Sequence, residues 1–197
     1  MTTFLLATAL RNYIDFSNEE ILMLQKTVQV RHFKKREIVL AYGEKEQYIS
    51  CVAKGLVRKY IMCGDRSIST EFAAEGGVIC SNSSFGNRLP SEYCIEAIEA
   101  TTLISFTLDS LEWLYKQSPV FFEFGKIIVA HSLLKCEERE IMLMKYDAQR
   151  RFNFFMETKS NLFLRLPQNM IASYLNIQPE TFSKLKRQAS LKKLDDI

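Results

Sequence analysis

The sequence predicts an α+β fold in which a β-barrel is followed by a long helix and then by two short helices. Three observations lead to this prediction. Between about Phe33 and Leu108, short β-branched and aromatic runs alternate with glycine-containing breaks. From about Val120 to Met144, apolar residues recur at helical spacing. The C-terminal stretch LPQNMIASYLNIQPETFSKLKRQ, residues 166–188, has two short apolar stripes, a break between them and a basic end.

The length and composition favour more than one core. The chain has 197 residues, of which 47% are hydrophobic, and this is enough for two modest domains. We expect a barrel domain at 1–118, a long helix at 119–145 and a C-terminal helical domain at 146–197. No window reaches the roughly 18 apolar residues of a membrane span, and no basic segment precedes the apolar start, so we expect a cytoplasmic protein with no membrane partner.

Capping signals mark the helices that flank the predicted barrel. In FSNEEILMLQKTVQV, Ser17 with Glu20 three residues later is the pattern of a capping box, so a helix begins there. After the barrel, TLDSLEWLYKQ predicts a short helix that stops near Pro119. Farther along, DAQRRFNFFMETK predicts another amphipathic helix.

The predicted long helix carries one continuous seam. Its members recur at alternating spacings of three and four residues and are Phe124, Ile127, His131, Leu134, Glu138 and Ile141. The seam packs either on its own chain or against the same helix of a second copy, and both alternatives stay open. Glu138 counts against pairing at that end, because a charge in a seam needs a partner or water.

Residues 166–188 have the pattern of two helices joined by a tight turn. Pro167 suits a first helical turn, and Ile171 belongs to an apolar face that covers about two turns. Asn176 tolerates the left-handed conformation of a sharp helix stop, and Pro179 suits the start of a new helix. This arrangement is typical of a helix-turn-helix, whose second helix enters the major groove of DNA. An α-hairpin that only caps a bundle is the alternative.

Positive charge is concentrated near the C-terminus. Residues 148–197 hold nine Lys and Arg against four Asp and Glu, a net charge of +5, whereas the preceding residues hold 17 against 19, a net charge of −2. A small basic module beside a nearly neutral chain favours a polyanionic partner. A solvated lysine-rich surface is the alternative.

Two segments resemble the Crp/Fnr superfamily of bacterial transcription regulators. PSEYCIEAIEATTLISFTLDSLEWLYKQSP, residues 90–119, resembles the last strands of the cyclic-nucleotide-binding-like barrel, and IASYLNIQPETFSKLKR, residues 171–187, resembles the recognition motif. The resemblance covers nearly the whole chain. It implies a double-stranded β-helix (jelly-roll) barrel, a dimerisation helix and a C-terminal helix-turn-helix. The partners it implies are a second copy of the chain, double-stranded DNA with two half-sites about one turn apart, and RNA polymerase.

The sequence departs from the family at both residue pairs that would bind a cyclic nucleotide. Members that bind cyclic nucleotides carry a Gly-Glu pair for the ribose and, about ten residues later, an Arg-Ser pair for the phosphate. Here Cys80 and Ser81 replace the first pair, and Ser91 and Glu92 replace the second, so the phosphate would lack its cation. Arg88 is a nearby candidate for a substitute. We predict a degenerate effector pocket that does not bind cyclic AMP in the family manner, and an unknown small-molecule effector stays open.

The resemblance also assigns roles on the recognition motif. Base reading falls to Pro179, Glu180, Ser183 and Lys184; Glu180 can accept from cytosine, and Lys184 can donate to guanine. We expect phosphate contacts from polar and basic residues around them, namely Gln168, Asn169, Thr181, Lys186 and Arg187. The tail after this motif is short, so we expect a reduced wing to which NLFLRLP, residues 161–167, contributes one arm.

The sequence contains no set of residues that suggests catalysis or a cofactor. The two histidines, His32 and His131, are too few and too far apart in the chain for a metal site. The five cysteines are scattered, which favours free thiols over a disulfide framework or a cluster. We therefore expect neither an enzyme nor a metal protein. A sensor or protein-interaction module that binds DNA only weakly and nonspecifically is the main alternative to a transcription regulator.

Overall fold

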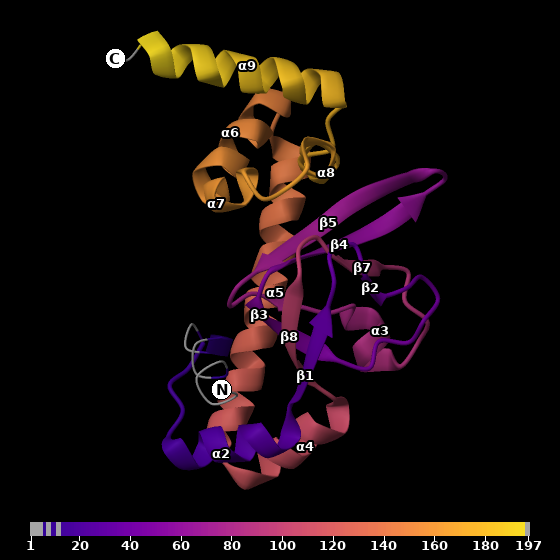
Figure 1. Cartoon of the computed structure of the whole chain (residues 1–197), viewed down its shortest axis with the longest axis vertical. Coiled ribbons are helices and arrows are strands. Elements are labelled where there is room, and N and C mark those ends of the chain that lie inside the picture. Colours follow the sequence, from indigo (N-terminus) through magenta and orange to yellow (C-terminus); the bar gives the residue numbers. More distant parts are fainter. Residues whose placement is uncertain (1–5, 7–8, 11–12, 196–197) are drawn as a thin grey trace. The chain divides into compact units, whose positions relative to one another are not determined.

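The structure is a computed structural model that describes residues 6, 9–10 and 13–195 (Figure 1). It consists of two compact units. The barrel unit comprises Met1–Ile61 and Glu71–Leu133, and the helical unit comprises Met62–Thr70 and Leu134–Ile197. The boundary between the units therefore falls inside the long helix, and the helical unit includes a short segment from the middle of the β region. The division into 1–118, 119–145 and 146–197 stays a prediction.

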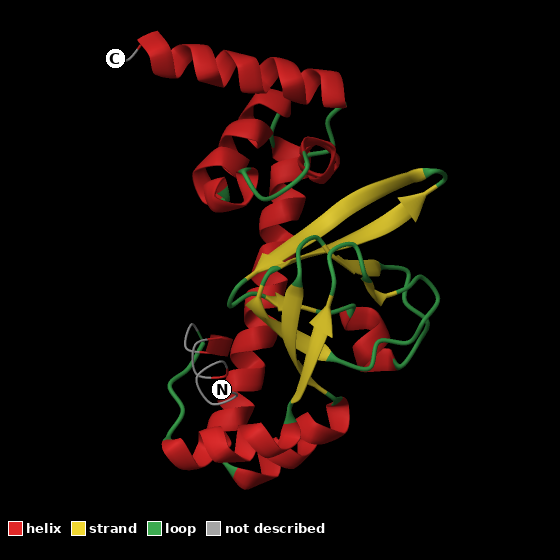
Figure 2. Ribbon diagram, viewed as in Figure 1, coloured by secondary structure: helices red, strands yellow, loops and turns green. Residues whose placement is uncertain are grey.

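Two four-stranded sheets form the barrel (Figure 2). The strand order is β1-β8-β3-β6 in one sheet and β2-β7-β4-β5 in the other. The strands are β1 (Gln29–Phe33), β2 (Ile38–Leu40), β3 (Ile49–Lys54), β4 (Leu56–Cys63), β5 (Arg66–Ala74), β6 (Val78–Ile79), β7 (Cys94–Ala97) and β8 (Thr101–Phe106). Buried apolar side chains from both sheets, such as Val52, Leu103, Val57 and Ile95, share one core. The two sheets enclose this core between them, which confirms the predicted barrel.

The helix before the barrel begins as predicted. In α2 (Asn18–Thr27), the Ser17 hydroxyl accepts from the backbone of Glu20, whose carboxylate accepts from the backbone of Ser17. The helix ends at Thr27, and Val30 already lies in β1, opposite Ile104 of β8. Antiparallel pairing along the whole of β1 satisfies backbone groups that a longer helix would have used.

Helices cover the outside of the barrel and build a second core there. They are α3 (Asn82–Asn87), α4 (Leu108–Gln117) and α5 (Pro119–Lys145). In this core, Phe121 and Ile128 of α5 pack with Leu114 of α4 and Cys51 of β3, all of which are buried. The start of α5 is therefore held on its own chain by apolar burial.

The predicted seam of α5 is divided between the core and the surface. Phe124 is only 4% exposed and belongs to the core of the barrel unit. The His131 ring lies edge-on to Tyr13, with 5.7 Å between the ring centroids. Leu134 and Ile141, by contrast, are 61% and 53% exposed. Further exposed apolar side chains of α5 are Val129, Leu133 and Met144.

The helical unit contains four helices after α5: α6 (Ala148–Thr158), α7 (Ser160–Phe163), α8 (Gln168–Tyr174) and α9 (Pro179–Asp195). The predicted helix α6 is confirmed, with Asp147 as its N-cap. The wing arm expected at residues 161–167 is wrong, because that stretch forms the end of α7 and a turn. Leu162 and Leu166 are both buried, and the backbone N–H of Leu166 donates to the carbonyl of Leu162 at 3.0 Å, a helical hydrogen bond that a strand does not make.

Within the described part of the chain, every helix is too short or too polar to cross a lipid bilayer.

Candidate functional site

Helices α8 and α9 are locked together by apolar contacts and by a tight turn. Ile171, Leu175 and Phe182 are at most 1% exposed, so the inner faces of both helices are buried. Asn176 adopts the left-handed conformation, with φ of 51°, and the backbone N–H of Ile177 donates to the carbonyl of Ala172 at 3.0 Å. The sharp stop predicted at Asn176 is confirmed, and it fixes the angle at which α9 leaves α8.

An arginine from α6 holds the turn from outside. The Arg151 guanidinium donates to the carbonyl of Leu175 at 2.8 Å and to that of Asn176 at 3.2 Å. These carbonyls stand at the C-terminal end of α8, where the helix leaves acceptors unsatisfied and where a cation is favourable. This role of Arg151 is not evident from the sequence, because the contact joins residues that lie 24 and 25 positions apart.

Aromatic rings of α6 and α7 pack against the buried face of α9. The Phe182 ring lies 5.5 Å from that of Phe152 in a T-shaped pair and 6.3 Å from that of Phe163 in a stacked pair. The Phe155 ring makes a T-shaped pair with Tyr174 of α8 at 6.0 Å. Such pairs have preferred geometries, so they restrict how α8 and α9 can tilt on the rest of the unit.

The outer face of α9 carries most of the predicted DNA-binding residues. Glu180, Ser183, Lys184 and Arg187 are exposed. Ser183 and Lys184 lie three and four residues after Glu180 and four and three residues before Arg187, so all four share one face. The Ser183 hydroxyl donates to the carbonyl of Pro179 at 3.0 Å, which leaves its lone pairs facing outward as acceptors. This face combines one carboxylate, one hydroxyl and two cations, which are groups that can contact base edges and phosphates.

The other predicted DNA-binding residues lie around this face. Thr181 and Lys186 are half-buried, and the Lys186 ammonium stands 5.8 Å from the centroid of the Phe163 ring. Gln168 and Asn169 are exposed at the start of α8, where the Asn169 side chain accepts from the backbone N–H of Met170 at 3.0 Å. Pro179 is exposed at the first position of α9. The predicted set is therefore gathered on α8 and α9, with Lys186 turned toward the aromatic core.

In the barrel, two of the positions that align with the family's cyclic-nucleotide site are hydrogen-bonded to each other. Ser81 and Ser91 are 0% and 2% exposed, and their hydroxyl groups form a hydrogen bond of 2.8 Å. The carboxylate of Glu46 accepts from the backbone N–H of Ser81 at 3.3 Å and from that of Tyr48 at 3.1 Å. Burial raises the pKa of Glu46, although these hydrogen bonds and the Arg31 guanidinium oppose the rise. A carboxyl group of the chain itself therefore stands beside Ser81.

Solved structures of other proteins have the same arrangement. FixK2 from Bradyrhizobium japonicum matches with a TM-score of 0.73 and 22% identity over 84% of this chain and 86% of FixK2. The c-di-GMP-responsive global regulator CLP from Xanthomonas campestris matches with a TM-score of 0.71 and 14% identity over 90% of this chain and 94% of CLP. A transcriptional regulator of the Crp/Fnr family from Eubacterium rectale matches with a TM-score of 0.67 and 19% identity over 92% of this chain and 88% of that protein.

This chain has the Crp/Fnr fold. The predicted combination of a cyclic-nucleotide-binding-like barrel, a long helix and a helix-turn-helix is thereby confirmed. No family model and no curated protein matches the sequence. At the identities found, the likeness establishes the fold, and the function has to be argued from the site.

Within the Crp/Fnr fold, the remaining effector-pocket candidates are two exposed residues and one buried thiol. Arg88 ends α3 and forms an ion pair with Asp109 at 3.8 Å, and both side chains are strongly exposed, at 71% and 89%. Glu92 is also exposed. Cys80 is buried, and burial raises the pKa of its thiol, so it stays protonated at neutral pH and is a poor nucleophile.

The barrel contains a buried lysine, Lys59, that was not among the predicted site residues. The Lys59 ammonium lies 2.6 Å from the carboxylate of Glu71, donates to the carbonyl of Cys80 at 3.1 Å and stands 5.4 Å from the centroid of the Tyr93 ring. A signal for it was present, because Lys59 is two residues after the buried Val57 and so points to the same side of β4. The barrel does hold a cation beside Cys80, and that cation is already paired.

Among the described residues, no group of three or more histidine, cysteine, aspartate or glutamate side chains is arranged to hold a metal ion.

Proposed function

We propose that this chain is a transcription regulator that binds an inverted-repeat site in double-stranded DNA as a homodimer. The observation that carries the proposal is the outer face of α9, where Glu180, Ser183, Lys184 and Arg187 are exposed together above a rigid apolar and aromatic support. A helix that is held in this way can enter the major groove without first becoming ordered. The likeness to Crp/Fnr structures supports the same function. The proposal assigns no catalysis to the chain and places its action in the cytoplasm.

The exposed apolar residues of α5 support dimerisation. Val129, Leu133 and Met144 are 68%, 59% and 79% exposed, and they share a broad face of α5 with Leu134 and Ile141. An apolar face of this kind on a helix of 27 residues is costly to leave in water. We assign it to the same helix of a second copy. Phe124 has no part in this pairing, because it is buried within its own chain.

We further propose that the regulator does not respond to cyclic AMP. The family phosphate site would need a cation or free N–H donors near Ser81 and Ser91. The two hydroxyl groups bond to each other, the Glu46 carboxylate takes the N–H of Ser81, and Lys59 is paired with Glu71. A phosphate would have to displace these contacts and face the carboxylate. Calorimetric titration with cyclic AMP should give no heat of binding, and a clear micromolar dissociation constant would refute this part of the proposal. The proposal is compatible with an effector of other chemistry and with RNA polymerase as a partner.

Selection from a random DNA pool tests the main proposal. The purified full chain, without added ligand and at near-physiological salt, should enrich an inverted repeat whose half-sites lie about one helical turn apart. Binding that is weak and indifferent to sequence would contradict the proposal and favour the sensor or protein-interaction module. Repeating the selection with Glu180→Ala should relax preference within the half-site, which distinguishes base reading by α9 from nonspecific attraction.

A further inference from the structure

Two strands of the β region end in the helical unit. The segment Met62–Thr70 contains the last residues of β4, a turn at Gly64 and the first residues of β5. Gly64 has φ of +59°, a left-handed conformation that glycine adopts without strain. The chain therefore enters the helical unit at Met62 and leaves it after Thr70, in addition to its later passage along α5. We call Met62–Thr70 the hairpin tip.

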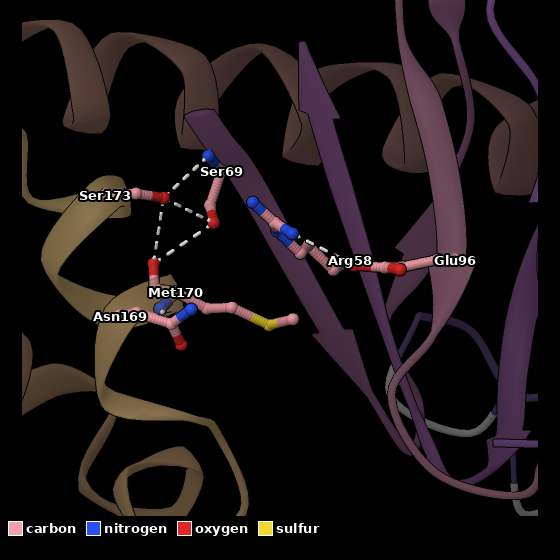
Figure 3. A network of polar contacts seen from close by, with 6 residues as sticks. All are labelled: Arg58, Ser69, Glu96, Asn169, Met170 and Ser173. Carbon is pink, nitrogen blue, oxygen red and sulfur yellow. Dashed lines mark hydrogen bonds and ion pairs between the residues drawn. The ribbon is translucent and has the colours of Figure 1, made fainter. Parts of the chain in front are cut away.

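Ser69 attaches the hairpin tip to α8. Its side chain is buried, and its backbone N–H donates to the Ser173 hydroxyl at 3.0 Å. The Ser69 hydroxyl donates to the carbonyl of Met170 at 3.1 Å and lies 2.9 Å from the hydroxyl of Ser173 (Figure 3). One residue of the hairpin tip thus makes three polar contacts with a single turn of α8. Buried hydrogen bonds of this kind are costly to lose, because the freed groups cannot reach water.

An arginine of α5 completes the attachment. The Arg139 guanidinium donates to the carbonyl of Ser69 at 3.1 Å and to that of Tyr174 at 3.4 Å, and it stands 5.3 Å from the centroid of the Tyr174 ring. Both the N–H and the C=O of Ser69 are therefore used by the helical unit. Arg139 contacts the hairpin tip and the end of α8 with the same group, which restricts how far they can separate.

These contacts leave the predicted DNA-reading surface open. They involve Met170, Ser173 and Tyr174 of α8, whereas the outward residues of α9, such as Lys184 and Arg187, remain exposed. A contact that masked DNA binding would cover those residues. Attachment to the inner turn of α8 instead fixes the helix from which the turn and α9 follow.

We propose that the hairpin tip is a positioning arm, which orients the helix-turn-helix for DNA through Ser69, Ser173 and Arg139. The inference rests on the proposed DNA-binding function and deepens it. None of the three residues touches the predicted DNA face; each acts by restricting α8, and through the turn it restricts α9. Without the arm, α8 and α9 have more orientations to lose when DNA binds, so affinity falls for every sequence while base preference is kept.

Hydroxyl removal in the full chain tests the arm. The variants are Ser69→Ala, Ser173→Ala and the double variant. The matched control is Ser50→Ala, Ser105→Ala and their double, because these two buried hydroxyl groups of the barrel unit also lie 2.9 Å apart. We expect each arm variant to bind the selected operator roughly two- to tenfold more weakly, the range of one hydrogen bond. The double variant should lose less than the product of the single losses. The control set should stay within about twofold of the wild type, and Ser173→Thr, which keeps the hydroxyl, should restore affinity.

A second measurement needs no DNA. Hydrogen exchange of the peptide that covers residues 62–70 should speed up in Ser173→Ala, since the backbone N–H of Ser69 loses its acceptor. Unchanged exchange would show that the attachment is not made in solution and would overturn the inference. Faster exchange with unchanged operator affinity would overturn the positioning role. If the wild type enriches no operator, the proposed function fails, and the positioning role fails with it. Faster exchange of residues 62–70 in Ser173→Ala would in that case still show that Ser69 contacts Ser173.

Discussion

Lys184 and Arg187 share the outer face of α9, and we predict that their removal has different effects on DNA binding. Lys184 is placed to donate to guanine, so Lys184→Ala should cost about 1 to 3 kcal/mol per half-site at one base pair, or roughly 5- to 150-fold in affinity. Both side chains are exposed, so either substitution should change folding stability by less than about 0.5 kcal/mol. The loss can therefore be attributed to binding.

Arg187→Ala should weaken all sequences alike. If Arg187 contacts a phosphate, its loss reduces the slope of log affinity against log salt by about 0.9 per copy, and by about 1.8 for a dimer that places two copies on one operator. Base preference should not change. Lys116→Ala is the matched control, because Lys116 is an exposed lysine of α4 in the barrel unit, and its removal should leave both slope and preference unchanged.

Fluorescence anisotropy with the selected operator and its single-base variants, at several salt concentrations, separates these outcomes. The base-reading assignment of Lys184 is refuted if Lys184→Ala loses affinity equally for every variant. The phosphate assignment of Arg187 is refuted if Arg187→Ala changes which base is preferred.

Three further predictions concern the support of α9, the barrel and the dimer. Phe182→Ala should destabilise the helical unit by about 3 to 5 kcal/mol and abolish specific DNA binding, since the ring is 1% exposed and packs on two other rings; a cost below about 1.5 kcal/mol in urea unfolding would contradict this. Burial raises the pKa of Glu46, so the fold favours the protonated carboxyl group. The free energy of unfolding therefore contains a contribution from this proton that is complete below the unfolded pKa of about 4.3 and is lost as the pH rises through the raised pKa of the folded state. Glu46→Gln should remove this loss, and parallel melting-temperature profiles for variant and wild type from pH 4 to 7 would argue against it. Cys136 is exposed on α5, so mild oxidation should cross-link two copies in wild type and in Cys63→Ser, but not in Cys136→Ser; cross-linking that instead needs Cys63 would oppose pairing along α5.

Much of the fold was predictable because local signals agreed with the final structure. The capping box at Ser17, the left-handed stop at Asn176 and the proline start at Pro179 each act within a few residues, and each is present. The missing wing arm was not predictable in this way, because it depends on the burial of Leu162 and Leu166 within the helical unit.

The candidate site was also predictable only where a local pattern decides the structure. Spacing alone placed the exposed residues of α9 on one face, since a helix has a known period. Spacing failed for the seam of α5, because it specifies which side chains share a face and not what covers that face; Phe124 is covered by its own chain.

By itself, the sequence determined the class of fold, the two helices of the helix-turn-helix, and which residues stand where the Crp/Fnr superfamily has its phosphate-binding pair. These features depend on residue identity and on short spacings, which the chain carries whatever its neighbours are. Tertiary structure alone decided that Arg151 holds the turn, that Lys59 and Glu46 fill the barrel beside Cys80 and Ser81, and that Ser69 attaches to α8. Each of these contacts joins polar groups that are distant in sequence, and burial makes them specific because groups removed from water must find partners within the protein.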